Sequence, residues 1–433
     1  MENNNNKNNN TKAPAFQLPK GTHDVMPDEV YKWQYVESVV REVSHNFCCL
    51  EIRTPMFEHT EVFLRNIGEE TDIVSKEMYT FFDKGERSLT LKPEGTAAVA
   101  RSFVQNGLYG LGMPQRMYYI TPVFRYENPQ KGRYRQHHQF GVEFFGSSSP
   151  YMDFEVIHLA HQVLSRLGLK GIKLNLNSIG CPACRPQYVE ALKAFASQNV
   201  DKLCGQCRTR LNTNPLRILD CKVDTCKQVL KYAPLISEHV CDECKTHQNT
   251  LVDMLKYAGI ECVINPFIVR GLDYYTRTVF EFVATSDTLG NQSTVCGGGR
   301  YDNLIKNMGG SDVNCVGFGM GIERLIAIMT EQNLDFGKPN TPQLTIAYAS
   351  PDQLEYCMQL ATKLRPHISV DIDYNGKSLK SQFKRADKCK SAYAITIGET
   401  EQKSGVAVLR NLSNRDEREI NLEIFLKSPL EYM

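Results

Sequence analysis

The sequence lacks any apolar run long enough to cross a bilayer, so it does not predict a membrane protein. Its first ten residues contain seven asparagines but neither an arginine nor an apolar core, which argues against a secretory signal or a mitochondrial presequence there. We interpret residues 1–15 as a disordered, Asn-rich tail. Neither a phosphate-binding loop nor a dinucleotide-binding fingerprint occurs, so those two nucleotide-binding folds are not supported.

The chain also lacks a strong charge of either sign. Its formal net charge is +1 over 433 residues, so any contact with nucleic acid must come from local basic patches. This length predicts two or three domains. Fifteen cysteines without a signal peptide indicate a reducing compartment, and we expect a cytoplasmic protein.

The most informative feature that is present is a basic segment between two candidate strands, Met117–Glu127 and His138–Phe145. A loop with proline and glycine joins them, which predicts a hairpin. Because side chains alternate faces along a strand, we expect two sets to share a face. These sets are Gln139, Gly141 and Glu143 on the returning strand, and Val123, Arg125 and Glu127 on the outgoing one. A cation, an amide, bare backbone and carboxylates suit a small charged substrate, although an ordinary exposed hairpin is the alternative.

Residues 124–136, FRYENPQKGRYRQ, resemble motif 2 of the class II aminoacyl-tRNA synthetases, and most of all that of the histidyl-tRNA synthetases. Further segments resemble the same family in the same order. They are Lys20–Glu29, Leu91–Arg101, Val269–Glu281, and Cys296–Leu304 with Gly317–Leu325. The resemblance runs from about Leu18 to the C-terminus, and five ordered motifs are far more specific than one.

The resemblance implies an α+β catalytic domain on a mixed, mostly antiparallel sheet, with an inserted helical subdomain and a C-terminal α/β domain. We expect the catalytic domain at 16–178 and 263–332, a Cys-rich insertion at 179–262, and an anticodon-binding domain at 341–433. The alternation of strand and helix candidates in the last of these predicts a largely parallel sheet. Motif 1 of the family, which resembles the region around Pro55, implies a homodimer.

Apolar spacing predicts helices over Val30–Phe47 and Tyr151–Leu167, and strands over Lys173–Asn177 and Phe280–Ala284. The glycine runs at 297–299 and 317–321 permit close approach of the backbone, but a glycine run alone is more often a loop.

The reaction that the resemblance implies is a histidine–tRNA ligation using ATP with Mg²⁺, L-histidine and tRNA(His). Histidine is first activated to histidyl-adenylate and is then transferred to the 3′ end of the tRNA. Joining two anions demands placed cations, and the planar guanidinium fork of arginine suits that task. By resemblance, Arg125 and Arg270 act at the α-phosphate and carboxylate, and Arg324 binds the γ-phosphate. Glu127 is a further ATP-binding candidate, and a lone arginine would more often form a surface salt bridge.

The same resemblance implies a pocket for histidine. Glu94, Gly95 and Thr96 would receive the α-ammonium group, since a carboxylate and a hydroxyl supply acceptors for its N–H donors. Gln139 is assigned with Arg125 and Arg270 to the catalytic set. The candidate histidine-binding residues together are Glu94, Gly95, Thr96, Arg125, Gln139, Glu143, Arg270, Tyr274, Tyr275 and Tyr301. On local evidence Tyr274 and Tyr275 could equally be a half-buried strand pair.

Contacts with tRNA are expected from two basic clusters. Gln130, Lys131 and Arg133 lie in the motif 2 loop, which in the family reaches the acceptor end of the tRNA. Lys377, Lys380 and Lys384 have helical spacing in the C-terminal domain, where a solvated helix face is the alternative.

Eight cysteines in the insertion have the spacing of metal ligands. They are Cys181, Cys184, Cys204, Cys207, Cys221, Cys226, Cys241 and Cys244. Eight thiolates could hold two structural Zn²⁺ ions, whereas reduced, free cysteines are the alternative. The family does not require zinc, so the resemblance does not decide between them.

Two other functions are compatible with the same core. One is a non-catalytic paralogue acting as a regulatory subunit in histidine biosynthesis, and the other is an RNA-binding scaffold. Such paralogues typically lack the C-terminal domain and the catalytic arginines, whereas Arg125, Arg270 and Arg324 are all present here. One departure from the family is Lys92, where many relatives have arginine, so a bidentate contact at that position is in doubt.

Overall fold

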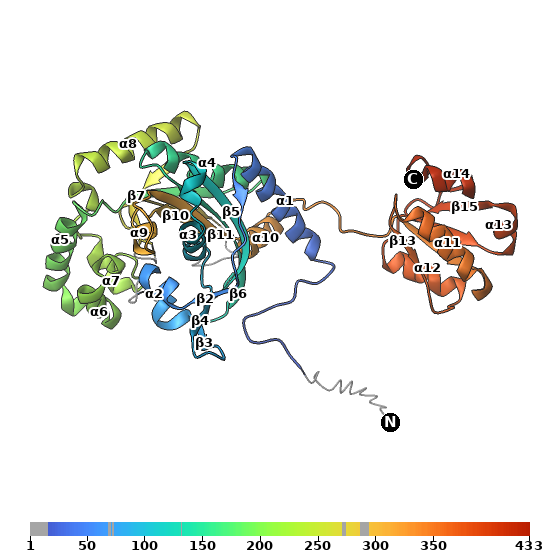
Figure 1. The fold of residues 1–433 in the computed structure, drawn as a ribbon, viewed down its shortest axis with the longest axis horizontal. Coiled ribbons are helices and arrows are strands. Elements are labelled where there is room, and N and C mark those ends of the chain that lie inside the picture. The colour runs from blue at the N-terminus through green and yellow to red at the C-terminus, as the bar shows by residue number, and fades with distance from the viewer. Residues whose placement is uncertain (1–15, 68–70, 72, 131, 271–273, 286–293) are drawn as a thin grey trace, which may run out of the picture. The chain divides into compact units, whose positions relative to one another are not determined.

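The computed structural model describes residues 16–67, 71, 73–130, 132–270, 274–285 and 294–433 (Figure 1). The chain divides into two compact units, with the boundary between Gly337 and Lys338. None of the helices in these ranges has the length and apolarity that a membrane crossing requires.

The first unit is built on an eight-stranded sheet with the strand order β1-β5-β6-β11-β10-β9-β7-β8. Its strands are β1 (Leu50–Glu51), β5 (Gln115–Phe124), β6 (Gln136–Phe145), β7 (Ile172–Ser178), β8 (Cys262–Ile264), β9 (Thr276–Ala284), β10 (Thr294–Arg300) and β11 (Cys315–Gly321). Only the edge pairs β1–β5 and β7–β8 are parallel. The predicted mixed, mostly antiparallel sheet is therefore confirmed.

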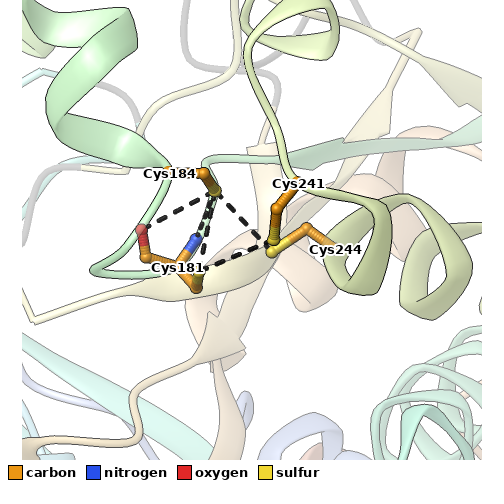
Figure 2. Close-up of side chains that lie close together, drawn as sticks. All are labelled: Cys181, Cys184, Cys241 and Cys244. Atoms are coloured by element: carbon orange, nitrogen blue, oxygen red, sulfur yellow. Dashed lines mark hydrogen bonds between the residues drawn. The ribbon is translucent and has the colours of Figure 1, made fainter.

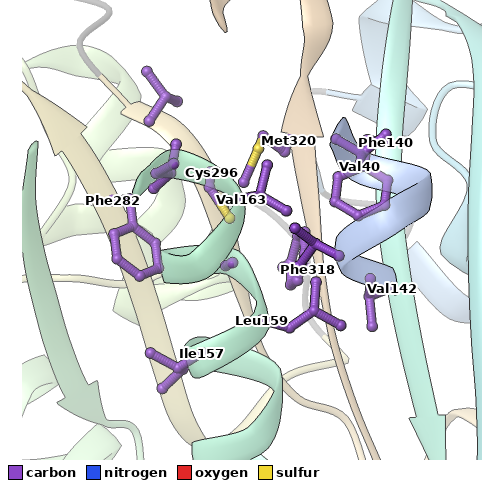
Figure 3. Close-up of a cluster of buried hydrophobic side chains, with 14 of the residues drawn as sticks. Val40, Phe140, Val142, Ile157, Leu159, Val163, Phe282, Cys296, Phe318 and Met320 are labelled. Carbon is purple, nitrogen blue, oxygen red and sulfur yellow. The ribbon is translucent and has the colours of Figure 1, made fainter. Parts of the chain in front are cut away.

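One face of this sheet is covered by α1 (Val30–Asn46), α4 (Pro150–Arg166) and α10 (Ile322–Glu331). Alternate residues of β6 and β11 point to that face, and Phe140, Phe318 and Met320 pack there against Val40 of α1 and Val163 of α4 (Figure 3). The predicted helices over α1 and α4 are confirmed to within a residue at each end, because their apolar positions recur every three or four residues.

The other face of the sheet carries smaller elements, which the sequence did not predict as a layer. They are the helices α2 (Glu61–Ile67), α3 (Thr96–Gln105) and α9 (Leu304–Asn307), and a three-stranded sheet of β2 (Phe57–His59), β4 (Ser88–Leu91) and β3 (Tyr79–Phe82). Val99 and Phe103 of α3 pack against Phe145 and Tyr119 of the large sheet. This cover is partial, and the polar side chains described below occupy the rest.

Helices follow β7 before the chain returns to the sheet at β8. They are α5 (Arg185–Gln198), α6 (Gly205–Thr213), α7 (Asp224–Leu230) and α8 (Asp242–Tyr257). Helix α8 packs against α4, and β8 pairs with β7. The inserted segment thus leaves and rejoins the sheet at one edge, and its eight cysteines lie among these helices.

The second unit has a five-stranded sheet with the order β13-β12-β14-β15-β16. Its elements are β12 (Leu344–Tyr348), α11 (Leu354–Leu364), β13 (Val370–Ile372), α12 (Leu379–Lys388), β14 (Tyr393–Ile397), α13 (Glu399–Ser404), β15 (Val406–Asn411), β16 (Glu417–Asn421) and α14 (Leu422–Lys427). The prediction of a largely parallel sheet is wrong, because β14–β15 and β15–β16 are antiparallel. Strand β12 pairs in parallel with both β13 and β14.

Candidate active site

Three arginines from distant parts of the first unit line one cavity of about 150 Å³. Arg125 follows β5, Arg270 follows β8, and Arg324 lies in the first turn of α10. The sequence placed these three together only by resemblance, and the structure brings their side chains to one space. A small cavity with three guanidinium groups is suited to an anion with several oxygens.

Each guanidinium is held by a neighbouring acceptor. Arg125 Nε donates to Pro93 O at 2.7 Å, and Arg324 Nε donates to Gly132 O at 3.1 Å. Arg270 forms an ion pair with Glu281. Burial disfavours the charge of Arg270, but Glu281 outweighs burial and holds its pKa above the ordinary value. The arginines are therefore oriented before any ligand arrives.

The cavity also contains His137, which the sequence analysis missed. Burial, followed by the charges of Arg125 and Arg324, lowers the pKa of His137 to about 3. Its imidazole is thus neutral at physiological pH and adds no positive charge to that of the arginines. The only sequence signal was its place next to His138 in the motif 2 hairpin, where two adjacent histidines point to opposite faces.

Beside the arginine cavity, the polar face of β6 is a floor that buried polar and aromatic side chains cover. Glu143 is fully buried and accepts hydrogen bonds from Thr96 Oγ1 at 2.7 Å and Tyr119 Oη at 3.2 Å, and from the hydroxyl of Tyr301. Burial raises the pKa of Glu143 to about 8, although these hydroxyls partly oppose the shift. The carboxyl group therefore exchanges a proton near neutral pH.

Aromatic rings enclose this carboxyl group. Tyr274 and Tyr275 are buried with ring centroids 4.7 Å apart, and the rings of Tyr274 and Tyr301 are 5.5 Å apart. Tyr119 was not predicted, but it lies directly opposite Gly141 in the β5–β6 register. A Cβ atom at Gly141 would lie 2.1 Å from the Tyr119 ring, so the glycine leaves the space that the ring fills. That pairing was the signal for Tyr119 once the hairpin register was known.

The Glu94-Gly95-Thr96 loop lies against the same floor and caps α3. Both Glu94 carboxylate oxygens accept backbone amide protons, from Thr96 at 2.7 Å and from Ala97 at 2.8 Å. Gly95 N donates to Gln139 Oε1 at 3.0 Å. The Glu94 carboxylate is expected to bind the α-ammonium group of histidine. In this structure each of its oxygens already accepts one hydrogen bond from a backbone amide of the loop or of α3. A carboxylate oxygen has more than one lone pair, so Glu94 can still accept from a ligand.

Lys92 is fully buried beside this loop, and its ammonium lies 3.3 Å from both the carbonyl and the hydroxyl oxygen of Thr54. Burial lowers its pKa to about 8, against the opposing charges of Glu58 and Glu94. Its partners form no bidentate pair with it, which agrees with the loss of the arginine fork at this position.

Glycines in β10 and β11 leave room for the functional side chains. A Cβ atom at Gly297 would lie 2.3 Å from Arg270 Nη2, and one at Gly319 would lie 2.1 Å from Gln139 Nε2. Reading residues 297–299 as a loop is wrong, because they form the centre of strand β10. The glycines sit in a strand where a side chain would collide with the site, which is one of the few reasons for glycine inside a sheet.

The predicted alternation along the outgoing strand holds only as far as Phe124. Strand β5 ends there, and Glu127 N donates to Arg125 O at 2.8 Å in a tight turn, so Arg125 and Glu127 do not share a strand face with Val123. Glu127 instead pairs with Arg133 at 2.9 Å, and both line the arginine cavity. Gln130 and Arg133 exchange backbone hydrogen bonds around the loop, and Lys131 lies outside the described residues.

The basic residues of the second unit are exposed, but they do not all share one helix face. Lys377 precedes α12, which begins at Leu379, whereas Lys380 and Lys384 lie on it. The neighbouring Arg385 pairs with Asp371 at 2.8 Å. The predicted helical spacing is therefore wrong at Lys377, which lies before Ser378, the N-cap of α12.

The eight cysteines form two groups of four, each with its sulfur atoms within 4.8 Å of one another. We name Cys181, Cys184, Cys241 and Cys244 the base tetrad (Figure 2) and Cys204, Cys207, Cys221 and Cys226 the distal tetrad. All fifteen cysteines of the chain are free thiols. The sequence could not assign this grouping, because spacing alone does not say which Cys-x-x-Cys pairs meet in space.

Comparison with known proteins agrees with this geometry. Residues 21–325 match the family model described as histidyl-tRNA synthetase, and residues 343–428 match that of an anticodon-binding domain. The chain is 49% identical to a histidine–tRNA ligase of Caldanaerobacter subterraneus subsp. tengcongensis, covering 94% of this chain and 97% of that protein. It is also 49% identical to the histidine–tRNA ligase of Acetivibrio thermocellus, with 95% and 98% covered.

Solved structures show the same likeness. The apo histidyl-tRNA synthetase of S. aureus aligns with a TM-score of 0.82 at 34% identity, covering 95% of this chain and 99% of that one. A Bacillus halodurans protein, titled an ATP phosphoribosyltransferase regulatory subunit/histidyl-tRNA synthetase, aligns with a TM-score of 0.64 at 21% identity, covering 89% and 99%. That second likeness supports the fold alone. On the family match and the near-complete coverage of its relatives, this chain belongs to the histidyl-tRNA synthetase family.

Proposed function

We infer that the chain is a histidine–tRNA ligase, which activates histidine with ATP and transfers it to the 3′ end of tRNA(His). The observation that carries this inference is the meeting of three guanidinium groups with a buried, tyrosine-lined carboxyl group on one face of the sheet. The arginine cavity suits a triphosphate, and the surroundings of Glu143 suit an imidazole ring. Substrates held side by side in this way react with much of their entropy cost already met by binding.

In the first step, a carboxylate oxygen of histidine attacks the α-phosphorus of ATP, and the bond from that phosphorus to the bridging oxygen breaks as pyrophosphate leaves. We assign Arg125 and Arg270 to the α-phosphate, where negative charge accumulates in the transition state. Arg324 with Glu127 is assigned to ATP binding. The rigid hold on each arginine supports these roles, since an oriented cation need not reorganise during the reaction.

The Mg²⁺ that accompanies ATP in this class of enzyme prefers oxygen ligands and usually binds through one or two carboxylates together with phosphates. The side chains of Glu127 and Glu323 line the arginine cavity and provide such oxygens. These residues fit the ion, which when bound would neutralise phosphate charge.

For histidine we propose the pocket formed by Glu143, Tyr274, Tyr275 and Tyr301, with Glu94, Gly95, Thr96 and Gln139 at the α-ammonium end. A carboxyl group whose pKa is near 8 can accept a proton from, or donate one to, an imidazole nitrogen. Three hydroxyl groups donate to Glu143, and an amino acid without ring nitrogens would leave its remaining acceptor position buried and unfilled. The site would therefore reject it strongly.

For tRNA we propose Gln130, Lys131 and Arg133 at the acceptor end, and Lys377, Lys380 and Lys384 in the anticodon-binding domain. The exposure of the three C-terminal lysines supports their assignment to phosphate contacts. Arg133 is already paired with Glu127 in the cavity, so its contact with tRNA requires that this pair open.

The remaining assignments are organisational. We propose a catalytic domain at 16–178 and 263–332, an insertion at 179–262 and an anticodon-binding domain at 341–433, in a homodimeric, cytoplasmic enzyme. Fifteen free thiols support a reducing compartment. We further propose that the eight cysteines of the insertion are ligands of structural Zn²⁺.

The regulatory-subunit alternative receives less support. It would require neither an intact set of three arginines nor a C-terminal domain, and this chain has both. The likeness to the Bacillus halodurans protein is one of fold alone.

The test is the exchange of labelled pyrophosphate into ATP, with each of the twenty amino acids offered separately. We expect exchange with histidine alone. Exchange that is absent, or that follows another amino acid, would overturn the assignment of function.

A further inference from the structure

We propose that the base tetrad binds a Zn²⁺ ion that positions the Tyr275 side of the histidine pocket, while the distal tetrad binds a second Zn²⁺ that organises only the insertion. The part of this proposal that concerns histidine rests on the function proposed above. The two metal sites themselves rest on the cysteines alone.

Sulfur separations in the base tetrad match a shared metal ion. The Sγ–Sγ distances are 3.6 Å for Cys181–Cys184 and 3.9 Å for both Cys181–Cys241 and Cys184–Cys244 (Figure 2). Four thiolates around a tetrahedral zinc with bonds of ~2.3 Å lie ~3.8 Å apart, whereas a disulfide brings its sulfurs to ~2.05 Å. The four sulfurs thus lie at the corners that one zinc ion needs.

The distal tetrad repeats this arrangement with different spacing. Cys204 Sγ lies 3.8 Å from Cys221 Sγ, and Cys204 N donates to Cys226 Sγ at 3.1 Å. Backbone amides that donate to sulfur are the usual outer partners of a zinc-bound thiolate, because they offset its charge. The same contact recurs in the base tetrad, where Cys181 N donates to Cys184 Sγ at 3.3 Å.

Helix ends favour thiolates in both tetrads. Cys184 is the N-cap of α5, Cys241 that of α8 and Cys204 that of α6. The positive end of a helix dipole stabilises a nearby negative charge, and the thiolate is the form that binds metal. Two Cys-x-x-Cys pairs that meet at helix starts are more specific than buried thiols scattered in a core.

The base tetrad closes the insertion where it leaves and rejoins the catalytic sheet. Cys181 and Cys184 follow β7, while Cys241 and Cys244 begin α8, sixty residues later along the chain. A metal ion that joins the two ends fixes a long loop, which is where a crosslink removes the most chain entropy.

From the base tetrad, hydrogen bonds lead directly to the histidine pocket. Arg185, next to Cys184, donates through Nη2 to Tyr275 O at 2.6 Å and to Gly180 O at 3.1 Å. Arg277, two residues beyond Tyr275, pairs with Glu243 at 2.7 Å, and Glu243 lies between the two cysteines of α8. Both Cys-x-x-Cys pairs therefore hold the segment that carries Tyr275.

A second connection runs through the next turn of α8. His247, three residues after Cys244, has its Nε2 atom 3.3 Å from Asp153 Oδ1. Asp153 forms a fully buried ion pair with Arg300, the neighbour of Tyr301. The orientation of α8, which the metal would fix, is thus coupled to another wall of the pocket.

Among the residues that the structure describes, the hydrogen bonds around the distal tetrad join partners within the insertion. On α6, Arg208 Nε donates to Leu203 O at 2.9 Å, and Arg210 Nη1 donates to Arg217 O at 3.2 Å. These contacts order α6 and its flanking turns. For that reason we expect loss of the distal metal to loosen the insertion without changing recognition of histidine.

The first test is metal analysis by native mass spectrometry of the full chain purified without chelator. We expect about two zinc ions per chain. Substitution with Co²⁺ should give the charge-transfer bands of tetrahedral cobalt bound to thiolates. Cys241→Ser and Cys221→Ser should each lose about one ion, and Cys389→Ser, a control in the second unit, should lose none. Fewer than about 0.1 zinc ions per chain, in protein that passes the histidine-dependent exchange assay, would overturn both sites while leaving the proposed function standing.

The second test separates the two tetrads by the KM for histidine. In Cys241→Ser we expect this KM to rise about tenfold, with the KM for ATP within about twofold of wild type, because only one wall of the pocket moves. Cys221→Ser should leave both KM values within about twofold. Equal values for histidine in the two variants would overturn the coupling.

Should Cys241→Ser fail to fold, Arg185→Lys provides the same test. It removes the guanidinium group, whose Nη2 donates to both carbonyl oxygens and whose Nε donates to Ile179 O at 3.0 Å, and leaves all four base cysteines in place. We expect it to retain both zinc ions and still to raise the KM for histidine by several-fold, on the order of threefold to tenfold. Full zinc content together with an unchanged KM would contradict the positioning role.

Discussion

The two faces of the eight-stranded sheet are made by the same strands and yet differ in almost every physical respect. On β6, Phe140 and Val142 face the helices, while Gln139 and Glu143 face the cavity side. The first face is stabilised by close apolar packing (Figure 3). The second face contains buried charges and glycines, which contribute little to stability. Alternate side chains of one strand thus stabilise the fold on one face and form the candidate active site on the other.

The difference between the two faces predicts which substitutions should change stability and which should change activity. A change on the apolar face should cost free energy of unfolding and spare the chemistry of the molecules that remain folded. A change on the polar face should lower activity and leave the free energy of unfolding unchanged or even increased. The reason is that active sites contain buried charged and polar groups that destabilise the folded state.

The largest effect is expected from Arg270→Ala on the polar face. Loss of one oriented cation at the α-phosphate should lower histidine-dependent pyrophosphate exchange by about a thousandfold, while the melting temperature stays close to that of wild type. Arg166→Ala is the matched control, because Arg166 pairs with Glu42 on the exposed side of α4. Exchange within about tenfold of wild type would count against the assigned role of Arg270.

Next in size is Phe318→Ala on the apolar face. Phe318 is buried and packs edge-on against Phe140 with ring centroids 5.5 Å apart. The cavity left behind should cost about 3–5 kcal/mol of unfolding free energy in urea. Phe318→Leu, which keeps most of the volume, should cost much less. Exchange activity per folded molecule should survive in both variants, and a specific loss of activity would show that the two faces are not separable.

Glu143→Gln should sharpen the comparison, because it is expected to stabilise the ligand-free protein. Burial raises the pKa of Glu143 to about 8 in the folded state, above its value in the unfolded chain. The cost of ionising it is therefore absent at acid pH, grows as pH rises through neutrality, and is complete above about pH 8. A glutamine cannot ionise and avoids this cost.

We expect the variant to melt above wild type at pH 8.5 by an amount equivalent to about 4–5 kcal/mol, and to match wild type near pH 4. Its KM for histidine should rise about a hundredfold. Differential scanning calorimetry at the two pH values makes the check, and a stability difference that shrinks as pH rises would refute the sign of this argument.

The smallest effect is expected from substitutions in the second unit. Replacing Lys377, Lys380 and Lys384 by serine should raise the KM for tRNA by roughly threefold to tenfold and reduce the salt dependence of tRNA binding. Pyrophosphate exchange, which needs no tRNA, should not change. Lys403 and Lys427 pair with glutamates on the same unit, so their replacement by serine is the control. If both sets of substitutions changed the KM for tRNA equally, Lys377, Lys380 and Lys384 would not be specific tRNA contacts.

Much of the polar face could be predicted from the sequence. Period-two alternation placed Gln139, Gly141 and Glu143 together, and the helices α1 and α4 followed from their apolar spacing. What alternation could not supply was the end of β5. The turn at Arg125 depends on a local backbone hydrogen bond rather than on hydrophobic pattern, so Arg125 and Glu127 were placed on a strand that had already ended.

Site residues that are recognised only from the pairing of distant segments could not be predicted from the sequence either. Tyr119 is identified only through its register with Gly141, and the two cysteine tetrads only through the folding of the insertion. The β15–β16 hairpin of the second unit was also missed, although the alternating burial of Val406–Asn411 is typical of a half-exposed antiparallel strand.

The proposed function depends most directly on where histidyl-adenylate would bind. A crystal structure of the full chain with a non-hydrolysable histidyl-adenylate analogue would test this in one measurement. We predict that Arg125 and Arg270 lie within about 3 Å of oxygens on the α-phosphate mimic, with an imidazole nitrogen at the same distance from Glu143. An analogue bound elsewhere, or bound with its ring away from Glu143, would contradict the account.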